Sequence, residues 1–408
     1  MPEKIAIILK GYPRLSETFI AQEIRALELR GIKVLLFSLR HPTDPATHPI
    51  HAEIKAPVVY LPEYVKDDIP RVFRGWWRVR KCPGYKKAWR RFIKDLKRDF
   101  TANRMRRFAQ ALVLANEVPE SVRLYYAHFM HTPASVTYYA SMINEVPWSI
   151  SAHAKDIWTI GDWEKREKLD SCEWLVTCTA ANVEHLRALA RDANKVSLLY
   201  HGLDFKRFNA NTSPENARDG GSATDPVQLI SVGRAVDKKG FDVLLDALAA
   251  LPAQLNWTFS HIGGGELMPK LQQQARELGL ESRINWLGAL PQTDVLALYR
   301  QADLFVLPSR ISNDGDRDGL PNVLMEAQSQ RLACLSTNIS GIPELIIHEH
   351  TGWLVPQQDS PSLCDAIQKL IGDPQLRNSL AQAGFERVHE KFSLDAGIDQ
   401  LVEKLRRS

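Results

Sequence analysis

The chain has 408 residues, of which 44% are hydrophobic and 25% charged, and its formal net charge is +4. This length suggests two domains, each large enough for its own core, and the composition is ordinary for a soluble globular protein. No apolar run approaches the roughly 18 residues of a membrane span, so we expect no transmembrane helix.

The amino terminus, MPEKIAIILKGYP, has too short an apolar stretch for a signal peptide and no small-residue cleavage site. We therefore expect a first strand over residues 4–9. The 5 cysteines form no C-x-x-C pair, which favours reduced structural thiols in a cytoplasmic protein.

Short apolar runs and helical patterns alternate through the first half of the chain. After the first strand, the pattern predicts a helix at 16–31, a strand at 32–39, a strand at 122–129, a helix near 132–143, a strand at 147–153, and a strand at 174–180 followed by a helix. Such alternation is typical of a parallel sheet covered by helices.

A strongly basic segment interrupts this alternation. Residues 71–107 hold fifteen Lys or Arg against two Asp, a net charge of +13 that leaves about −9 for the rest. Tryptophans and Phe92 are interleaved, and Cys82-Pro83-Gly84 predicts a break between two helices of a hairpin at about 66–115. An anionic lipid surface is one partner for such a segment, a merely solvated hairpin is equally consistent, and nucleic acid is a weaker alternative.

Residues 209–226, NANTSPENARDGGSATDP, are polar and unpatterned, so they are the predicted linker between two domains. Strand and helix patterns restart after them. Strands are predicted at 227–232, 255–262, 284–290, 302–309 and 332–338, with helices at 241–251, 267–280, 293–302, 321–330, 361–373 and 376–390. Two α/β domains joined by a polar link imply a cleft between them, where ligands favour binding.

The stretch SRISNDGDRDGLPNVLMEAQSQ, residues 309–330, crowds acids between a strand and a helix with Pro321 at its first position. Carboxyl ends of strands are where open α/β sheets place ligands. Free backbone N–H groups around Gly319–Val323 suit a phosphate, and Glu326, four residues after Asn322, shares its helix face. A helix cap by Asp318 or Asp316 with a solvated Glu326 is the simpler reading.

Two further patterns bear on a phosphorylated ligand. In SVGRAVDKKG, Arg234 and Lys239 flank a turn after a strand, where two cations could neutralise a diphosphate leaving group without a metal; a solvated basic loop is the alternative. The acids of DGD, residues 314–316, could instead form a D-x-D metal clamp, although three-letter acidic patterns are common in loops.

Candidate residues of the first domain follow its predicted strands. His153 stands at the end of one strand with Lys155 and Asp156 beside it, although a single histidine is more often structural, and His128 and His131 call for the same caution. The first strand leads into residues that could line the other wall of the cleft: Lys10, Gly11, Arg14, Ser16 and Glu17. A helix cap at Ser16 is the alternative.

Together these motifs resemble glycosyltransferase family 4, retaining enzymes of the GT-B fold. The family's G-R-x(4)-K-G fits Gly233-Arg234 with Lys239-Gly240, and its E-x(7)-E fits Asp318 to Glu326, followed by SGIPELI at 340–346. YPRLSETFIAQEI and SAHAKDIW resemble the bacterial exopolysaccharide and colanic-acid-type subset. The family's first acid is usually glutamate; here it is Asp318, one methylene shorter, and Asp316 competes for its role.

The resemblance implies an α/β fold with two Rossmann-like parallel-sheet domains facing a central cleft. It implies an acceptor domain at 1–208, the linker at 209–226, a nucleotide-sugar domain at 227–385, and a C-terminal helix at 386–408 that packs back toward the first domain. The implied activity is a retaining hexosyltransferase that moves a sugar from a UDP- or GDP-hexose to a growing, lipid-linked polysaccharide. We then expect peripheral association with the inner face of the cytoplasmic membrane.

By the same resemblance, Arg234 and Lys239 would hold the diphosphate, Glu326 the ribose, and Asp318 the sugar, with His153 near the reacting centre. The implied catalytic set is His153, Asp318, Arg234 and Lys239. The implied donor set is Gly233, Arg234, Lys239, Gly264, Leu287, Gly319, Leu320, Asn322, Val323 and Glu326. No cofactor, metal ligand or nucleic acid partner is implied. The departing phosphate itself can serve as the base, so no dedicated catalytic carboxylate is required, and the two cations with the helix terminus remove the need for a D-x-D metal.

Two alternatives come from other classes of protein. One is a soluble GT-B sugar-phosphate synthase or phosphorylase with a small acceptor, although no signature of a pyridoxal-binding lysine is present. The other is a binding homologue that has lost activity, which the presence of Arg234, Lys239 and Glu326 disfavours.

Overall fold

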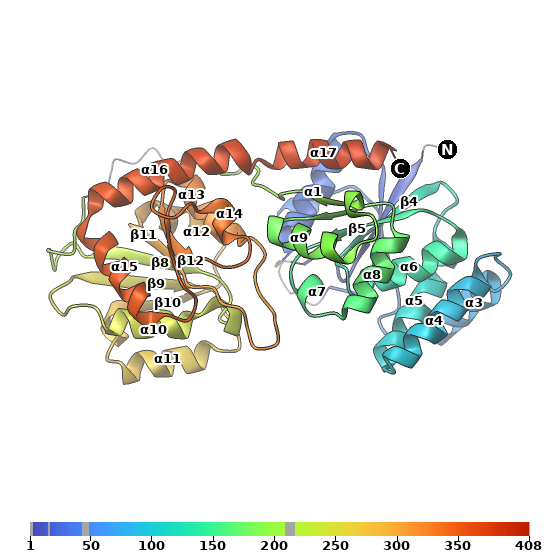
Figure 1. The fold of residues 1–408 in the computed structure, drawn as a ribbon, viewed down its shortest axis with the longest axis horizontal. Helices are drawn as coiled ribbons and strands as arrows, with labels where there is room; N and C mark the ends of the chain where they lie inside the picture. Colours follow the sequence, from blue (N-terminus) through green and yellow to red (C-terminus); the bar gives the residue numbers. More distant parts are fainter. Residues whose placement is uncertain (1–2, 15–16, 43–48, 209–216, 408) are drawn as a thin grey trace. The chain divides into compact units, whose positions relative to one another are not determined.

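The computed structural model describes residues 3–14, 17–42, 49–208 and 217–407. Contacts between residues divide the chain into two compact units. Unit 1 comprises Met1–His201 and Asp395–Ser408, and unit 2 comprises Gly202–Leu394. Each unit is built on its own parallel sheet (Figure 1). The predicted α/β class with two Rossmann-like domains is confirmed.

Unit 1 has a seven-stranded sheet in the order β3-β2-β1-β4-β5-β6-β7, in which neighbouring strands are parallel. The strands are β1 Lys4–Leu9, β2 Val34–Ser38, β3 Val58–Tyr60, β4 Val122–His128, β5 Trp148–Ala152, β6 Leu175–Thr177 and β7 Val196–Leu198. Helices cover both faces of such a sheet, so its central strands read as continuous apolar runs. KIAIIL of β1 is buried from Ile5 onward for this reason.

The helices of unit 1 are α1 Thr18–Leu29, α2 Ile50–Glu53, α3 Ile69–Val79, α4 Tyr85–Arg98, α5 Ala102–Glu117, α6 Thr132–Asn144, α7 Lys155–Trp158, α8 Asp162–Ser171 and α9 Ala180–Leu189. The basic segment breaks at Cys82-Pro83-Gly84 as predicted, but it forms three helices rather than a two-helix hairpin. The third helix, α5, begins because the Thr101 side chain caps it by accepting a hydrogen bond from the backbone N–H of Arg104.

Charge on the basic segment is only partly neutralised. Six of its cations pair with carboxylates: Arg71, Arg91, Lys94, Arg98, Arg104 and Arg107. The aromatic side chains of this segment are divided between buried and exposed positions. Phe92 is 6% exposed and belongs to the core, whereas Phe73, Trp77 and Trp89 are between 43% and 58% exposed. Arg80 stacks over the ring of Trp77 at 3.4 Å.

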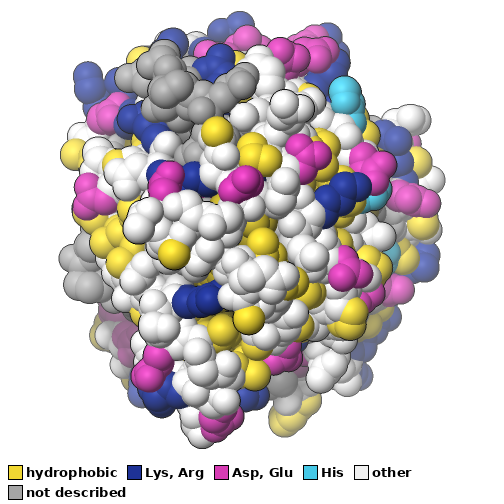
Figure 2. Space-filling model, turned by 90° about the vertical axis from the view of Figure 1, so that its left-hand side faces the viewer, with side chains coloured by type: hydrophobic (Ala, Val, Ile, Leu, Met, Phe, Trp, Pro, Cys, Tyr) yellow, Lys and Arg dark blue, Asp and Glu magenta, His cyan; other side chains and the backbone are white. Residues whose placement is uncertain are grey.

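Unit 2 has a six-stranded parallel sheet in the order β10-β9-β8-β11-β12-β13. Its strands are β8 Val227–Val232, β9 Trp257–Ile262, β10 Ile284–Gly288, β11 Leu304–Leu307, β12 Ala333–Thr337 and β13 Trp353–Val355, and its helices are α10 Phe241–Ala249, α11 Met268–Glu277, α12 Gln292–Gln301, α13 Asn322–Ser329, α14 Ile342–Leu345, α15 Ser360–Gly372 and α16 Pro374–Lys391. On the face that Figure 2 shows, acidic and basic side chains are interspersed.

The segment between the units includes the predicted linker. Residues 209–216 of the predicted linker lie outside the described residues, and the next residues are packed rather than extended. Arg218 pairs with Asp225 and with the buried carboxylate of Asp303 at 3.1 Å. Helix α16 runs through the predicted boundary at 385 and ends at Lys391, because Phe392 is buried and its carbonyl accepts from the N–H of Leu203.

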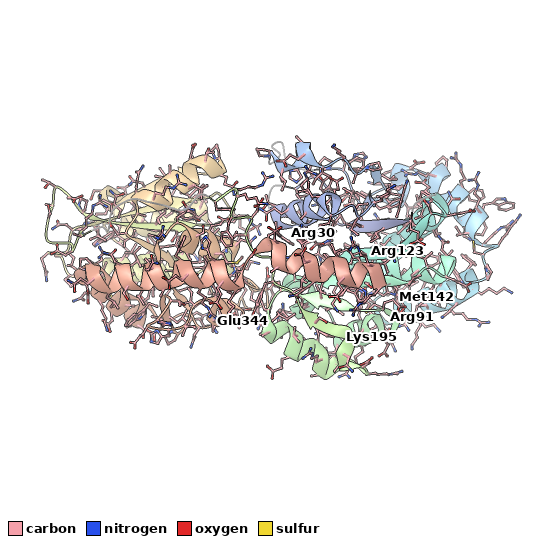
Figure 3. All side chains as sticks on the ribbon, turned by 90° about the horizontal axis from the view of Figure 1, so that it is seen from above. Arg30, Arg91, Arg123, Met142, Lys195 and Glu344 are labelled. Atoms are coloured by element: carbon pink, nitrogen blue, oxygen red, sulfur yellow. The ribbon has the colours of Figure 1, made fainter. Side chains whose placement is uncertain are left out.

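The last helix, α17 Leu394–Arg407, contributes residues to unit 1. Arg30, which directly follows α1, donates to Asp395 and Asp399, and Arg123 of β4 donates to the carbonyl of Leu405. Figure 3 labels both arginines. Leu401 and Leu405 are fully buried. Among the described residues, no helix combines the length and the apolarity that crossing a membrane requires.

Candidate functional site

The strongest cluster of predicted site residues lies where the strand order of unit 2 reverses. In the order β10-β9-β8-β11-β12-β13, chain order runs outward in both directions from the neighbours β8 and β11. Ligands of open α/β sheets bind beyond the carboxyl ends of such a neighbouring pair. The loop after β8 carries Gly233 through Lys239, and the loop after β11 carries the acids around Asp318.

Backbone hydrogen bonds join the loops after β8, β9 and β10. The N–H of Ala235 donates to the carbonyl of Gly264 at 2.8 Å, and the N–H of Gly263 donates to that of Gly288 at 2.7 Å. A Cβ atom at Gly263 would lie 2.1 Å from the carbonyl oxygen of Gly233. The triple glycine after β9 therefore lets two loops approach more closely than side chains would allow.

Gly240, in the loop after β8, packs against the backbone directly after strand β11. It has a φ of +66°, and a Cβ there would lie 2.1 Å from the carbonyl oxygen of Pro308. The left-handed conformation alone costs an alanine about 1–2 kcal/mol. The contact with rigid backbone adds to this, and it would displace the adjacent Lys239.

Gly240→Ala is therefore expected to lower the melting temperature much more than Gly279→Ala. The control position has a similar φ of +70°, but no atom lies within 4 Å of its ideal Cβ. It therefore reports the conformational cost alone. Thermal unfolding of both variants measures the difference, and equal shifts would show that the Gly240–Pro308 contact is unimportant.

Two lysines and two aspartates form an ion-pair cluster at this point of the sheet. Lys239 Nζ lies 2.7 Å from one carboxylate oxygen of Asp318, and Lys238 Nζ lies 3.4 Å from the other. Lys238 also lies 3.2 Å from Asp316. Burial favours the neutral acid at Asp318, but the two ammonium groups outweigh it, so the pKa of Asp318 lies below its ordinary value. The cluster is thus charged at neutral pH.

The acids of the D-x-D pattern have separate partners. The carboxylate of Asp314 accepts from the backbone N–H of Asp316 at 3.0 Å, whereas the carboxylate of Asp316 faces Lys238. The two carboxylates of this pattern are therefore held by different partners, and Lys238 neutralises that of Asp316.

Helix α13 begins at Asn322, and Pro321 is its N-cap residue rather than its first helical residue as predicted. The extended backbone of Pro321, with ψ of 117°, explains this difference of one position. The loop before it is fixed by the carbonyl of Gly319, which accepts from the N–H of Gly341 in the segment after β12. Within the described ranges no side chain caps α13. The N–H of Leu324 donates to the carbonyl of Pro321, which leaves the N–H groups of Asn322 and Val323 available to an anion.

Glu326 lies one turn into α13 and is partly buried. Burial raises the pKa of its carboxyl to about 7. Among the described residues, no hydrogen bond or ion pair to this carboxylate is found. A partly buried carboxylate without a partner is energetically costly, and such a group is a candidate for binding the hydroxyl donors of a ligand.

The remaining donor-site candidates lie in the same unit. Arg234 is exposed and pairs with no carboxylate in the described ranges, while Gly264 has open space around its ideal Cβ position. Leu287, near the end of β10, is 38% exposed. The donor-site candidates lie at the end of β10 (Leu287) and on the loops and the helix that follow β8, β9 and β11: Gly233, Arg234, Lys239, Gly264, Gly319, Leu320, Asn322, Val323 and Glu326.

The acceptor-site candidates follow β1 in unit 1, except that Ser16 lies outside the described residues. Arg14 forms an ion pair with Glu17, and burial raises the pKa of Glu17. Burial also lowers the pKa of Lys10, and the nearby guanidinium groups of Arg40 and Arg14 lower it further. Gly11 is buried against Arg40, which its ideal Cβ would approach to 3.1 Å. This edge of the sheet is therefore a concentration of positive charge.

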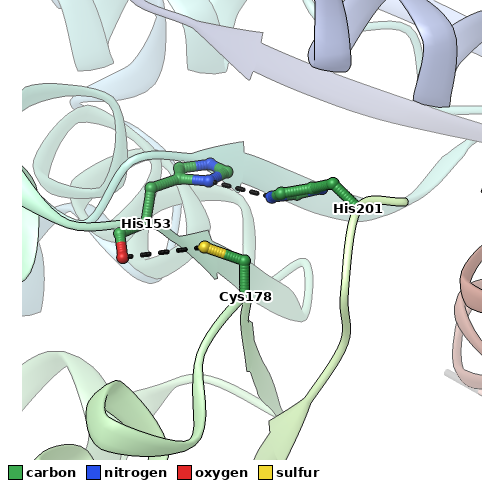
Figure 4. Close-up of side chains that lie close together, drawn as sticks. All are labelled: His153, Cys178 and His201. Carbon is green, nitrogen blue, oxygen red and sulfur yellow. Dashed lines mark hydrogen bonds between the residues drawn. The ribbon is translucent and has the colours of Figure 1, made fainter. Parts of the chain in front are cut away.

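His153 directly follows β5 and is 7% exposed. Its Nδ1 lies 3.1 Å from Nε2 of His201 (Figure 4), and burial lowers the pKa of both rings. Asp156, next to it, is structural: its carboxylate accepts from the backbone N–H groups of His153, Ala154 and Met130.

The sequence also singled out His128 and His131 as histidines that are more often structural. His128 lies 3.0 Å from the buried carboxylate of Glu23, and burial lowers the pKa of His131 to about 3. Neither belongs to the predicted site.

Several residues of these clusters were not predicted from the sequence. Lys238 carries no separate motif, although the Asp-Lys-Lys run of residues 237–239 offered two cations for one turn. Arg40 follows β2, whose pairing with β1 brings it beside Lys10. His201 follows the three-residue strand β7, which has too weak an apolar pattern to be predicted.

Comparison with known proteins agrees with this architecture. Residues 212–387 match the family model of Glycosyl transferases group 1. The chain is 26% identical to the putative colanic acid biosynthesis glycosyltransferase WcaL of Salmonella typhimurium, over 98% of this chain and 99% of that protein. It is 31% identical to the amylovoran biosynthesis glycosyltransferase AmsK of Erwinia amylovora, over 54% of this chain and 53% of AmsK.

Solved structures show the same fold at lower identity. HepE of Anabaena, crystallised with UDP and glucose, is 18% identical with a TM-score of 0.70, and the match covers 100% of both chains. The sucrose-phosphate synthase of Thermosynechococcus elongatus is 19% identical with a TM-score of 0.73, over 99% of this chain and 98% of the other.

Proposed function

We propose that this chain, a GT-B-type member of the glycosyl transferases group 1 family, is a retaining hexosyltransferase. It transfers a sugar from a nucleoside diphosphate hexose, with UDP or GDP as the nucleotide, to a lipid-linked polysaccharide acceptor. The observation that carries this proposal is the cluster of Lys239, Lys238 and Asp318 at the strand-order reversal of unit 2, next to the exposed Arg234.

In this proposal the main contribution to catalysis is the stabilisation of negative charge by cations. Negative charge builds up on the diphosphate as the bond to the sugar breaks, and preorganised cations and N–H groups stabilise that charge. Lys239 and Arg234 hold the diphosphate, with the uncapped start of α13 beside them. Asp318 keeps the ammonium group of Lys239 in position and contacts the hydroxyls of the sugar. Glu326 accepts hydrogen bonds from the ribose hydroxyls.

The acceptor hydroxyl attacks on the face that the leaving group vacates, and the departing phosphate takes up its proton. This route needs neither a dedicated catalytic carboxylate nor a metal clamp. His153 of unit 1 is assigned a place near the reacting centre. The names of the relatives support the reaction class, since WcaL and AmsK are named for exopolysaccharide assembly and HepE was crystallised with UDP and glucose.

The charge of unit 1 supports an anionic acceptor. Burial lowers the pKa of Lys10, and the neighbouring cations Arg40, Arg14 and Lys155 lower it further. Such a group of cations suits a phosphate or diphosphate of the kind that links a saccharide to a lipid. We assign the binding of this acceptor to Lys10, Gly11, Arg14, Ser16 and Glu17.

The basic helices α3 and α4 support docking on the cytoplasmic face of a membrane. Exposed Phe73 and Trp77 lie four residues apart on one face of α3. The exposed cations Lys86, Lys87, Arg90 and Lys97 follow on α4, and no ion pair to them occurs within the described ranges. Aromatic side chains beside unpaired cations are typical of surfaces that bind anionic lipid.

Changing Lys86, Lys87, Arg90 and Lys97 together to glutamate is expected to lower binding to vesicles that contain anionic lipid. Each surface cation contributes about 1 kcal/mol, so the affinity should fall by at least roughly 10³-fold. The matched control changes four exposed cations of unit 2, Lys206, Lys270, Arg276 and Lys391, to glutamate. Vesicle sedimentation measures both, and equal losses would assign the α4 cations a role in solvation only.

A soluble sugar-phosphate synthase or phosphorylase with a small acceptor is the second candidate, since a sucrose-phosphate synthase shares the fold. A transfer assay with labelled UDP- and GDP-hexoses distinguishes the two. The proposal predicts label in a lipid fraction when a lipid-linked saccharide extract is the acceptor. Label only in a sugar phosphate, or sugar release only with inorganic phosphate, would favour the second candidate.

A further inference from the structure

A buried group of potential metal ligands lies at the carboxyl edge of the unit 1 sheet. His153 follows β5, Cys178 follows β6, and His201 lies three residues after β7. Because β5, β6 and β7 are adjacent parallel strands, their carboxyl ends bring these residues together. The ligand atoms of all three lie within 4.8 Å of one another (Figure 4).

We propose that His153, Cys178 and His201 form a binding site for a divalent transition-metal ion of the zinc class. Two imidazoles and one thiolate are ligands that zinc takes, with a fourth position left to water or another ligand. Among the described residues, this is the only such group of three. On binding, Zn²⁺ would replace the proton of the Cys178 thiol, and this proton would be released to the solvent.

The distances in the group are close to those a metal requires. Tetrahedral zinc, with bonds of about 2.0 Å to nitrogen and about 2.3 Å to sulfur, separates its ligand atoms by roughly 3.3–3.6 Å. His153 Nδ1 and His201 Nε2 are already 3.1 Å apart. The widest separation in the group is below 4.8 Å, so the thiol must approach by roughly 1 Å to complete the geometry.

A buried carboxylate lies behind one of the two rings. Glu23, 1% exposed, has a carboxylate oxygen 4.0 Å from Nδ1 of His201, the ring nitrogen that does not face His153. A carboxylate behind the non-ligating nitrogen of a histidine is a common feature of zinc sites. The Nε2 atom of His153 is buried and lacks a hydrogen-bond partner within the described residues.

Aromatic side chains enclose the site. The ring of Phe19 lies 4.9 Å from that of His153 and 4.7 Å from that of His201, and Phe129 lies 4.7 Å from His153. Cys178 is 8% exposed. A hydrophobic shell of this kind limits exchange with water and strengthens metal–ligand bonds. In the metal-free protein the thiol of Cys178 faces the carbonyl oxygen of His153 at 3.9 Å (Figure 4), so metal binding would exchange this weak hydrogen bond for a bond to the ion.

Cobalt(II) titration of the full-length protein, without nucleotide, tests the site directly. Cobalt bound tetrahedrally with a thiolate ligand is expected to give a sulfur-to-metal charge-transfer band in the near ultraviolet, saturating at one equivalent. Added Zn²⁺ should abolish the band. Cys178→Ser should lose it, whereas Cys364→Ser, which removes a buried thiol of α15 in unit 2, should keep it.

His201→Asn provides a second variant, and it should weaken cobalt binding by more than tenfold while keeping the thiol. Circular dichroism confirms that both variants are folded. No band in the wild-type protein, or a band that persists in Cys178→Ser, would overturn the proposal.

A consequence for activity follows, and it rests on the proposed function. Zinc bound to His153 would remove that ring from the reacting centre, so micromolar Zn²⁺ should inhibit transfer and a chelator should restore it. Cys178→Ser should resist this inhibition. The cobalt spectrum does not depend on transfer, so an inactive protein with a Cys178-dependent band would contradict the proposed function alone.

Discussion

Lys239→Ala is expected to lower turnover by about 10²–10³-fold, the usual cost of removing one preorganised group that stabilises transition-state charge. Lys239 follows the strand β8 at the reversal of strand order, and its ammonium group lies 2.7 Å from Asp318. Its loss removes a cation from the diphosphate and leaves Asp318 with the more distant Lys238 alone. Steady-state release of nucleotide from the sugar donor measures the effect.

Two controls accompany Lys239→Ala. Lys270→Ala, on the exposed surface of α11, should retain wild-type turnover. The side chains of Lys239 and Asp318 are 12% and 15% exposed, so Lys239→Ala should also lower the melting temperature, and turnover is compared below it, on folded protein. Near wild-type turnover in folded Lys239→Ala would show that the diphosphate lies elsewhere.

Glu326→Ala should weaken donor binding by about 10- to 100-fold, which corresponds to about 1.5–3 kcal/mol for hydrogen bonds to a charged group. The carboxylate is partly buried and lacks a partner among the described residues, so it is available to accept from the ribose hydroxyls. Calorimetric titration with the nucleotide measures the affinity. A variant that binds as tightly as the wild type would sink this assignment.

Glu326→Gln is expected to increase the stability of the folded protein at neutral and higher pH. The folded-state pKa is raised from 4.5 to about 7, so the folded protein holds this proton more tightly than the unfolded chain. The wild type therefore loses stability as the pH rises from about 4.5 to 7, by at most about 3 kcal/mol. Glutamine has no such loss and should be more stable above pH 7, with little difference below about pH 4.5. If the melting temperature of Glu326→Gln equals that of the wild type at every pH in this range, the burial of the Glu326 carboxyl is contradicted.

Much of the fold could be predicted because parallel strands with both faces covered leave strong patterns. KIAIIL, VRLYYAHF and LFVLPS are continuous apolar runs, and β1, β4 and β11 are found there. The strands β3, β7 and β13 were missed, since each has three residues and lies at a sheet edge, where burial demands less apolar sequence. Because β7 was not predicted, His201, which follows it, was not recognised as a candidate residue.

The donor site was more predictable than the acceptor site for a physical reason. Its residues lie on two loops with local signals, a glycine turn with cations and an acidic loop before a helix. The neighbours of Lys10 and His153 come instead from strands that are distant in the sequence and adjacent in the sheet, as Arg40 and His201 show. No local pattern encodes such pairings; only the strand order reveals them.

The most direct test of the account is a thermal-shift titration with UDP, GDP and ADP, without added metal, on the wild type and on Lys239→Ala. A ligand at 100 times its dissociation constant stabilises the folded state by about 2.7 kcal/mol. We predict that one diphosphate raises the melting temperature of the wild type clearly and that of Lys239→Ala much less. No shift with any nucleotide in folded protein, or equal shifts in both proteins, would contradict a nucleoside diphosphate site at the reversal of strand order in unit 2.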